Sequence, residues 1–268
     1  MSSPVLAAVV LFGLVAAGAG QAVGQAVSPA PSDQKARDIL NAAMQALGGK
    51  AFLGAQDMRA EGRAFQFGRD EELQGLARFT EYEKFPDKLR QELGKDKEVV
   101  VVINGDKGWD KTFRGVREYP EEEMRRIREN RLLSVENVLR FRLNEPGVTL
   151  RYAGTDLIGN RLADLVEVED ADNRVVTIAV DQSNKLPVRR QWSRRNPKTR
   201  LLEKEVELLG NYRKIGDIQT PFYSMRERDG QKIFEVFLTT AAYNQNLPDS
   251  LFQRPPGPDR PEPGRKER

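Results

Sequence analysis

The sequence predicts a mainly β protein (α+β), built on one strongly curved antiparallel sheet. Residues Val99–Ile103 form an unbroken β-branched run, which is typical of a strand covered on both faces. Turn sequences such as Asn104-Gly105-Asp106 and Asp229-Gly230 separate the apolar segments. The strand-like segments follow one another with short connections, which favours a meander of about eleven strands.

Composition excludes the commonest catalytic sites. The 268 residues include no cysteine and no histidine, so disulfides, Cys/His metal sites and Ser-His or Cys-His catalytic pairs are ruled out. The 43 basic and 40 acidic residues are interspersed, and no basic helix or aromatic-basic motif indicates nucleic-acid binding. We expect no nucleic acid, no cofactor, no metal and no enzymatic activity, and a monomer.

The N-terminus has the features of an export signal. Residues 1–26 contain no charged side chain, and an apolar run after Pro4 is followed by small residues that suit cleavage. A membrane anchor is the alternative, but the run is shorter than the ~20 residues that a span needs. We therefore expect a periplasmic protein in which residues 27–32 are a linker and residues 33–254 form the folded domain.

Two helical segments are expected. Ser32 or Asp33 caps a helix that runs to about Leu47, where Gly48-Gly49 ends it. A second segment begins at Pro120, and an apolar stripe runs along it with a break expected near Asn130. The stripe consists of Leu132, Val135, Leu139 and Leu143.

Strands fill most of the remaining chain. They are expected within 58–67, 74–82, 89–93, 99–103, 109–114, 148–152, 161–169, 174–181, 186–194, 202–208, 220–227 and 232–240. The segment 202–208 alternates apolar and acidic residues, which predicts a charged outer face made of Glu203, Glu205 and Glu207. Residues 255–268 are rich in proline and charge, and we expect a disordered tail.

Several short phrases resemble the periplasmic lipoprotein-carrier and lipoprotein-sorting superfamily, the LolA/LolB-like fold. They are the segments 43–49, 84–90, 104–109, 186–189, 216–221 and 249–252. The resemblance implies an incomplete barrel covered by a helical lid, with an apolar concave cavity that takes acyl chains. It is a resemblance to the broad superfamily, so lipoproteins as the cargo are not implied, and no lid-locking arginine is assigned.

The candidate site is a lipid cavity under the predicted lid. A groove lined with apolar side chains gains about 0.8 kcal/mol for each methylene of an acyl chain that it buries. The proposed lining residues are Val100, Ile103, Trp109, Leu132, Val135, Leu139 and Leu143. The alternative interpretation is that these residues fill an ordinary core.

A second candidate site is basic. Arg189, Arg190, Arg194 and Arg195 could dock to lipid phosphates or to an acidic partner at a membrane. The alternative is a solvated face, with cross-strand ion pairs to the acidic strand 203–207. Asp170, Asp172 and Asn173 are interpreted as turn residues, because the spacing lacks the glycine and distal glutamate of a calcium loop.

The sequence thus predicts an exported carrier or binding protein for a lipid, acyl chains or a similar apolar ligand. The alternative is an envelope sensor or scaffold of the same fold that binds a protein partner.

Overall fold

The computed structural model describes residues 33–196 and 199–260. The predicted signal peptide (1–26), the linker (27–32) and the last part of the predicted tail (261–268) lie outside the described residues. The chain divides into two compact units, and the division falls within α3 (Glu121–Leu132) and within the last strand. Of the described residues, unit 1 holds 54–130 and 234–260, and unit 2 holds 33–53 and 131–233.

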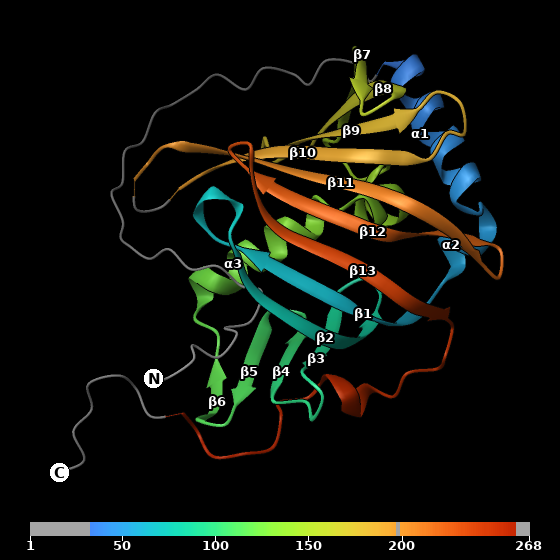
Figure 1. Ribbon diagram of the computed structural model, residues 1–268. Helices are drawn as coiled ribbons and strands as arrows, with labels where there is room; N and C mark the ends of the chain where they lie inside the picture. The colour runs from blue at the N-terminus through green and yellow to red at the C-terminus, as the bar shows by residue number, and fades with distance from the viewer. Residues whose placement is uncertain (1–32, 197–198, 261–268) are drawn as a thin grey trace. The chain divides into compact units, whose positions relative to one another are not determined.

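Unit 1 is a run of antiparallel strands, most of them joined by tight turns (Figure 1). Its strands are β1 (Asp57–Phe67), β2 (Leu73–Lys84), β3 (Lys88–Leu93), β4 (Val99–Asn104), β5 (Lys107–Thr112), β6 (Gly115–Glu118) and most of β13 (Gln231–Tyr243). The order in the sheet is β6-β5-β4-β3-β2-β1-β13. Short 3₁₀ turns lie at Arg69–Glu71 (η1) and Asp249–Phe252 (η3).

Unit 2 contains the other strands and most of the helices. Its strands are β7 (Thr149–Ile158), β8 (Arg161–Glu169), β9 (Val175–Asp181), β10 (Pro187–Arg195), β11 (Leu202–Ile215) and β12 (Ile218–Arg228), which are neighbours in chain order. Its helical elements are α1 (Gln34–Leu47), α2 (Lys50–Gly54), α4 (Val135–Asn137) and a π-helical turn, η2 (Val138–Arg142).

The predicted fold class is confirmed. The described residues form thirteen antiparallel strands, where a meander of about eleven was expected and twelve segments were named, and β6 and β7 are the two open ends of the strand order. The strand with no counterpart among those twelve segments is β6. Its sequence, Gly-Val-Arg-Glu, has too little alternation to be recognised, and it forms because the turn at Gly115 returns the chain alongside β5.

The first helix begins and ends as expected. Asp33 is its N-cap, and the carboxylate accepts a 2.8 Å hydrogen bond from the amide of Lys35. At Gly48 the backbone adopts φ 129°, and a Cβ there would lie 2.3 Å from the carbonyl oxygen of Asp217. Only glycine fits both the conformation and the contact. The buried residues of α1 pack in unit 2, where the helix lies against β7, β8, β9 and β12.

The second helical segment breaks later than predicted. The α-helix continues through Asn130 to Leu132, and Ser134 then caps a new turn by accepting a 3.2 Å hydrogen bond from the amide of Asn137. The π-helical turn that follows inserts one extra residue per turn relative to the α-helical spacing. It therefore adds Val138, which is fully buried, to the stripe that the α-helical period had identified.

The tail was expected to be disordered from residue 255, but the structure shows ordered backbone up to Arg260. The amide of Val116 donates to the carbonyl of Pro258, and the amide of Arg260 donates to the carbonyl of Val116. The guanidinium of Arg260 also pairs with Asp110. These bonds satisfy the outer edge of β6, which explains why a proline-rich and charged segment is ordered up to Arg260.

Candidate ligand-binding site

One face of the unit 1 strands carries a continuous apolar surface, called here the α3-side surface because α3 packs on it. Its buried members are Ala64, Ala77, Phe79, Leu93, Val99, Val101, Ile103, Tyr119 and Met124. Around them lie apolar side chains that are only partly buried: Leu89, Ile127, Phe234, Val236 and Leu238. The buried members include two small residues, Ala64 and Ala77, as well as large ones. The five partly buried side chains leave part of the apolar surface exposed.

The predicted lining residues of β4 and β5 belong to two different clusters, because side chains alternate between the two faces of a strand. Ile103 belongs to the α3-side surface, together with Val99 and Val101. Val100 and Trp109 belong to a separate cluster with Val102 and other residues. Because neighbouring residues of a strand point to opposite faces, Val100 and Ile103 cannot line the same side of β4. Of the three predicted lining residues in unit 1, Ile103 is the one that belongs to the α3-side surface.

The cluster around Trp109 is covered by the C-terminal segment of the described chain. Leu247 and Phe252 pack against Val100 and Trp109, and Phe252 has no exposed surface. Asp57 fixes the path of this segment by accepting hydrogen bonds from the amides of residues 245 and 247, at 2.6 and 3.0 Å. Val100 and Trp109 therefore lie in a buried cluster that does not include Ile103.

An arginine holds the start of α3 against β5 and β6. Arg117 pairs with Asp110 at 2.6 Å and with Glu123 at 2.8 Å, and both carboxylates are buried. Burial raises the pKa of Glu123, although the charge of Arg117 acts in the opposite direction. Burial also raises the pKa of Tyr119, whose hydroxyl is buried without a hydrogen-bond partner. Arg117, Asp110 and Glu123 thus form a buried ion cluster next to Tyr119, a member of the α3-side surface.

The predicted lid residues lie at the end of α3 and in the turns that follow it, within unit 2. Val135, Leu139 and Leu143 are buried, and Leu132 is half-buried. Arg142 holds the segment in place, because its Nη2 donates to Asp170 at 2.9 Å and its Nη1 donates to the carbonyl of Leu132 at 3.1 Å. Since Ile103 belongs to unit 1, a cavity shared by these residues and Ile103 remains a prediction.

The turn at Asp170 has the structural role expected for it. Its carboxylate accepts hydrogen bonds from Arg142, from Arg174 and from the amides of Asp172 and Arg174. Burial tends to raise the pKa of Asp170, but these bonds outweigh it and hold the pKa below the usual value. Within residues 33–196 and 199–260, no group of acidic side chains is arranged to hold a metal ion.

The predicted basic docking surface is largely occupied by ion pairs. Arg189 pairs with Asp156 at 2.9 Å, and Arg194 lies 2.8 Å from Glu205. The Nε of Arg190 donates to Glu207, its cross-strand neighbour. The alternative, cross-strand pairs between β10 and β11, therefore describes Arg190 and Arg194. Arg195 is exposed, and its guanidinium donates to the carbonyl of Arg200.

The predicted orientation of β11 is wrong. Glu205 is 2 % exposed whereas Leu202 is 65 % exposed, so the acidic side of this strand faces inward at this end. The reason lies in the neighbouring strands. β10 and β12 present arginines to the same face, so the glutamates are neutralised there, and we call this group the charge network. It consists of Arg190, Arg194, Glu203, Glu205, Glu207, Arg226 and Arg228.

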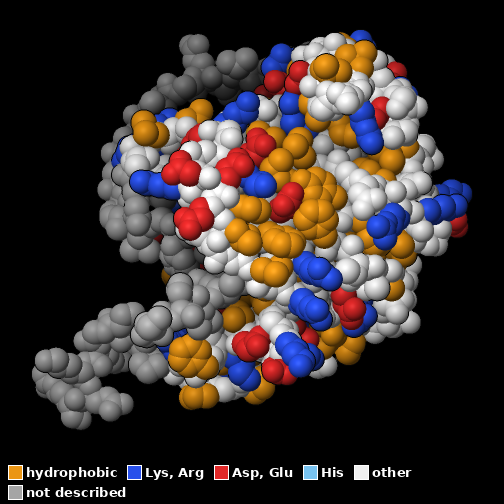
Figure 2. Space-filling model, viewed as in Figure 1, with side chains coloured by type: hydrophobic (Ala, Val, Ile, Leu, Met, Phe, Trp, Pro, Cys, Tyr) orange, Lys and Arg blue, Asp and Glu red, His pale blue; other side chains and the backbone are white. Residues whose placement is uncertain are grey.

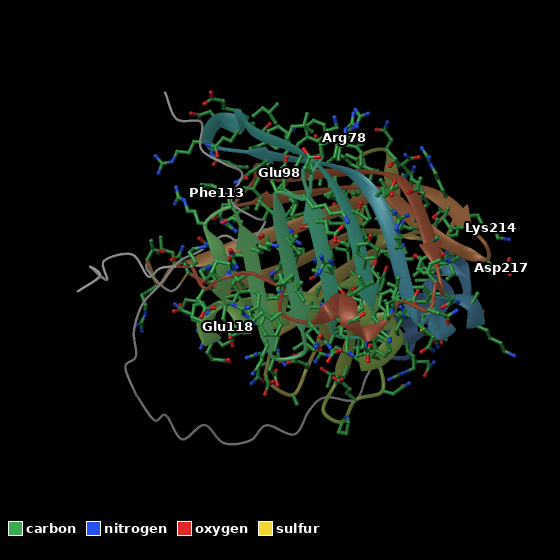
Figure 3. The ribbon with its side chains drawn as sticks, turned by 90° about the horizontal axis from the view of Figure 1, so that it is seen from below. Arg78, Glu98, Phe113, Glu118, Lys214 and Asp217 are labelled. Carbon is green, nitrogen blue, oxygen red and sulfur yellow. The ribbon has the colours of Figure 1, made fainter. Side chains whose placement is uncertain are left out.

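The other face of β1, β2 and β13 exposes apolar side chains, and this feature was not predicted. The rings of Phe65 and Phe237 meet edge to face with centroids 5.7 Å apart. Leu73 and Leu76 are each 54 % exposed. Figure 2 shows apolar atoms gathered over β13, with basic side chains beside them. In Figure 3, Arg78 of β2 points away from the strands into solvent.

The fold is shared with solved structures of low sequence identity. A DUF1329 family protein from Desulfovibrio piger superposes with a TM-score of 0.56 at 14% identity, covering 81% of this chain and 97% of that one. A LolA superfamily protein from Nitrosomonas europaea gives 0.53 at 14% identity with the same coverage. A putative outer membrane lipoprotein-sorting protein domain from Vibrio parahaemolyticus gives 0.53 at 13% identity, again with 81% and 97%.

These likenesses establish the fold. No family model matches the sequence, and no curated protein matches it. Among the described residues, no helix is long and apolar enough to cross a membrane.

Proposed function

We propose that this chain, which has the fold of the LolA superfamily, is an exported, non-enzymatic carrier or binding protein for a lipid or another ligand with an acyl chain. The observation that carries the proposal is the α3-side surface of unit 1. Its half-buried rim of Ile127, Phe234 and Leu238 leaves apolar area that a ligand would cover. Completing the burial of one such side chain contributes about 1 kcal/mol or more.

Three further observations support this function. The strand order is open-ended, which suits a sheet that admits a ligand along one face. The structural relatives include a LolA superfamily protein and a lipoprotein-sorting domain. The N-terminal sequence predicts export, which would place the protein where lipids must cross an aqueous space. Residues of the helical segment, Leu132 to Leu143, are proposed to act as the lid.

The test is uptake of a fluorescent fatty acid by delipidated protein. Ile127→Asp places a charge at the half-buried rim and is expected to weaken uptake by about tenfold or more, since it replaces an apolar contact by a desolvated carboxylate. Phe113→Asp is the matched control. Phe113, labelled in Figure 3, lies on the turn between β5 and β6, is 76 % exposed and does not belong to the α3-side surface. Equal uptake by both variants would count against the proposed site.

A second candidate function is binding of an envelope protein, as a sensor or scaffold. The exposed apolar face that includes Leu76 and Phe237 favours it, because monomeric proteins seldom leave such surface uncovered. The double variant Leu76→Asp/Phe237→Asp separates the two functions. A carrier retains acyl-chain uptake in this variant, whereas a scaffold loses its complex with the partner protein and shows no uptake even as wild type.

A further inference from the structure

One group of side chains in unit 1 points away from the α3-side surface, and it is called here the outer patch. It consists of Arg63, Phe65, Leu76, Arg78 and Phe237. Ala64 of β1, Ala77 of β2 and Val236 of β13 all belong to the α3-side surface or pack against it. Because side chains alternate along a strand, the residues next to these three point to the opposite face. The outer patch is therefore separate from the surface proposed to hold the acyl chain.

The three apolar members of the outer patch lie together. Leu76 is directly opposite Phe65 in the β1–β2 register, and the rings of Phe65 and Phe237 meet edge to face. Leu76 is 54 % exposed and Phe237 is 39 % exposed. The C-terminal segment covers the same face of β4 and β5 with Leu247 and Phe252, but the cluster that these residues form does not include the outer patch. The described part of unit 1 thus leaves this apolar area open to solvent.

The two arginines of the outer patch have no partner in the part of the chain that the structure describes. Arg63 and Arg78 are directly opposite each other on β1 and β2, and both are exposed; Arg78 points into solvent in Figure 3. Neither makes a hydrogen bond or an ion pair with another described residue. Glu61 of β1 pairs with Arg59 instead, and Glu235 of β13 forms no pair with either arginine. Like charges directly opposite on a sheet are destabilising, so a bound anion would relieve the repulsion between these two.

The unpaired arginines decide between the occupants that an exposed apolar face can have. A second copy of the chain that docked through the same face would bring four unpaired guanidinium groups together, and these would repel one another. A standard protein interface uses about 20–30 residues on each side, whereas the outer patch has five members. An anionic bilayer matches both parts of the patch. Its phosphates accept hydrogen bonds from guanidinium groups, and leucine and phenylalanine side chains are buried at the level of its headgroups.

We propose that the outer patch docks the protein on the surface of an anionic phospholipid bilayer. Arg63 and Arg78 contact lipid phosphates, and Phe65, Leu76 and Phe237 lie at the level of the headgroups. The inference goes beyond the proposed carrier function, because it assigns a membrane contact to the face of the strands that does not hold the acyl chain. An apolar face alone also suits a protein partner, and it is the unpaired arginines that favour a bilayer.

The test is co-sedimentation of the full chain, purified after export, with sucrose-loaded vesicles. Phosphatidylcholine vesicles that contain phosphatidylglycerol are compared with vesicles of phosphatidylcholine alone. Each arginine close to an anionic surface contributes about fivefold in affinity. The wild type should therefore bind the anionic vesicles about tenfold or more tightly than the neutral ones, and high salt should weaken this binding.

Three variants examine the two parts of the patch. Arg63→Gln/Arg78→Gln should lose the preference for anionic vesicles, and it should be at least as stable as the wild type in urea, because a repulsive pair is removed. Leu76→Ser should weaken binding to both kinds of vesicle, since it removes apolar area. Lys95→Gln/Lys107→Gln is the matched control. It removes the same charge from exposed positions outside the outer patch, and it should keep the preference.

The outcomes separate this proposal from the carrier function. Equal binding of the wild type to the two kinds of vesicle would overturn the docking proposal. A control that loses as much binding as Arg63→Gln/Arg78→Gln would also overturn it, because general charge would then be responsible. So would a protein partner that this double variant releases, if the wild type binds no vesicles.

Uptake of the fluorescent fatty acid without vesicles is measured on the same variants. Uptake that persists while vesicle binding fails overturns the docking proposal and leaves the carrier function standing. Vesicle binding with the expected preference but without any uptake supports the docking proposal and refutes the carrier function.

Discussion

Nη2 of Arg142 donates to Asp170 at 2.9 Å, and this bond joins the π-helical turn to the turn between β8 and β9. Both side chains are more than nine-tenths buried. The arginine also donates to Glu145 and to the carbonyl of Leu132, so it holds both ends of the segment proposed as the lid. The position of that segment in unit 2 thus depends on one buried guanidinium.

Removing this guanidinium should destabilise the protein strongly. Arg142→Ala leaves the buried carboxylate of Asp170 with less compensation, and the free energy of unfolding should fall by about 3–5 kcal/mol. Arg151→Ala is the control, because the pair of Arg151 with Glu167 is exposed and should contribute less than about 1 kcal/mol. Urea denaturation measures both. A loss for Arg142→Ala no larger than that of the control would show that the bond does not hold the segment.

The carboxylate of Asp170 should make the free energy of unfolding depend on pH in the acidic range. Because the pKa of Asp170 is held below that of an unfolded aspartate, about 3.9, its contribution is complete above that value and is lost as the pH falls through the lower, folded value. The urea midpoint should therefore decline steeply below about pH 4. Asp170→Asn should be less stable at pH 7 and should show a shallower decline. If the urea midpoint of Asp170→Asn declined with pH as steeply as that of the wild type, Asp170 would not be the group responsible.

Arg117 should show the opposite pH dependence. In Arg117→Ala the buried Glu123 loses its cation, and its pKa, already raised by burial, should rise further. A raised pKa opposes folding at neutral pH, and this penalty disappears as the pH falls below the unfolded value. We expect a loss of about 3 kcal/mol at pH 7 that shrinks toward pH 4.

Two variants check that interpretation. Arg117→Ala/Glu123→Gln should recover part of the stability at pH 7, because the isolated charge is gone. Arg128→Ala removes an arginine whose partners, Asp106 and Glu121, are mostly exposed, and it should have little effect at any pH. A loss in Arg117→Ala that is the same at pH 4 and pH 7 would mean that packing, not charge, is responsible.

Truncation should reveal that the C-terminal segment is structural up to Arg260. A chain ending at Gln253 loses the two backbone bonds to Val116 and the pair between Arg260 and Asp110. Its free energy of unfolding should fall by about 2 kcal/mol. A chain ending at residue 260 should match the full-length protein in thermal denaturation. Equal stability of all three chains would contradict this role.

Local patterns in the sequence were sufficient for most elements. The N-cap at Asp33 and the turn at Asp229-Gly230 identify their structures through backbone chemistry that does not depend on distant contacts. The run Val99–Ile103 indicated a strand buried on both faces, and the structure confirms it. The division of that strand between two clusters also follows from alternation, but the prediction placed Val100 and Ile103 in one cavity.

What the sequence could not supply was the side on which each strand is buried. Alternation shows that Leu202 and Glu205 point to opposite faces, but not which face is inward. That depends on β10 and β12, whose arginines neutralise the acidic face. The abundance of arginine at alternate positions of 190–194 and 226–228 was the available signal. The ordered tail was missed for a similar reason, since its bonds go to Val116 and Asp110, far away in the sequence.

The central claim is that the fold holds an acyl chain, and equilibrium binding to the delipidated wild-type protein tests it most directly. A fluorescent acyl probe should bind saturably with a Kd on the order of micromolar or tighter, since each buried methylene contributes about 0.8 kcal/mol. An unlabelled acyl compound of the same length should displace it. Fluorescence that rises without saturation, or that an excess of competitor leaves unchanged, would contradict the account.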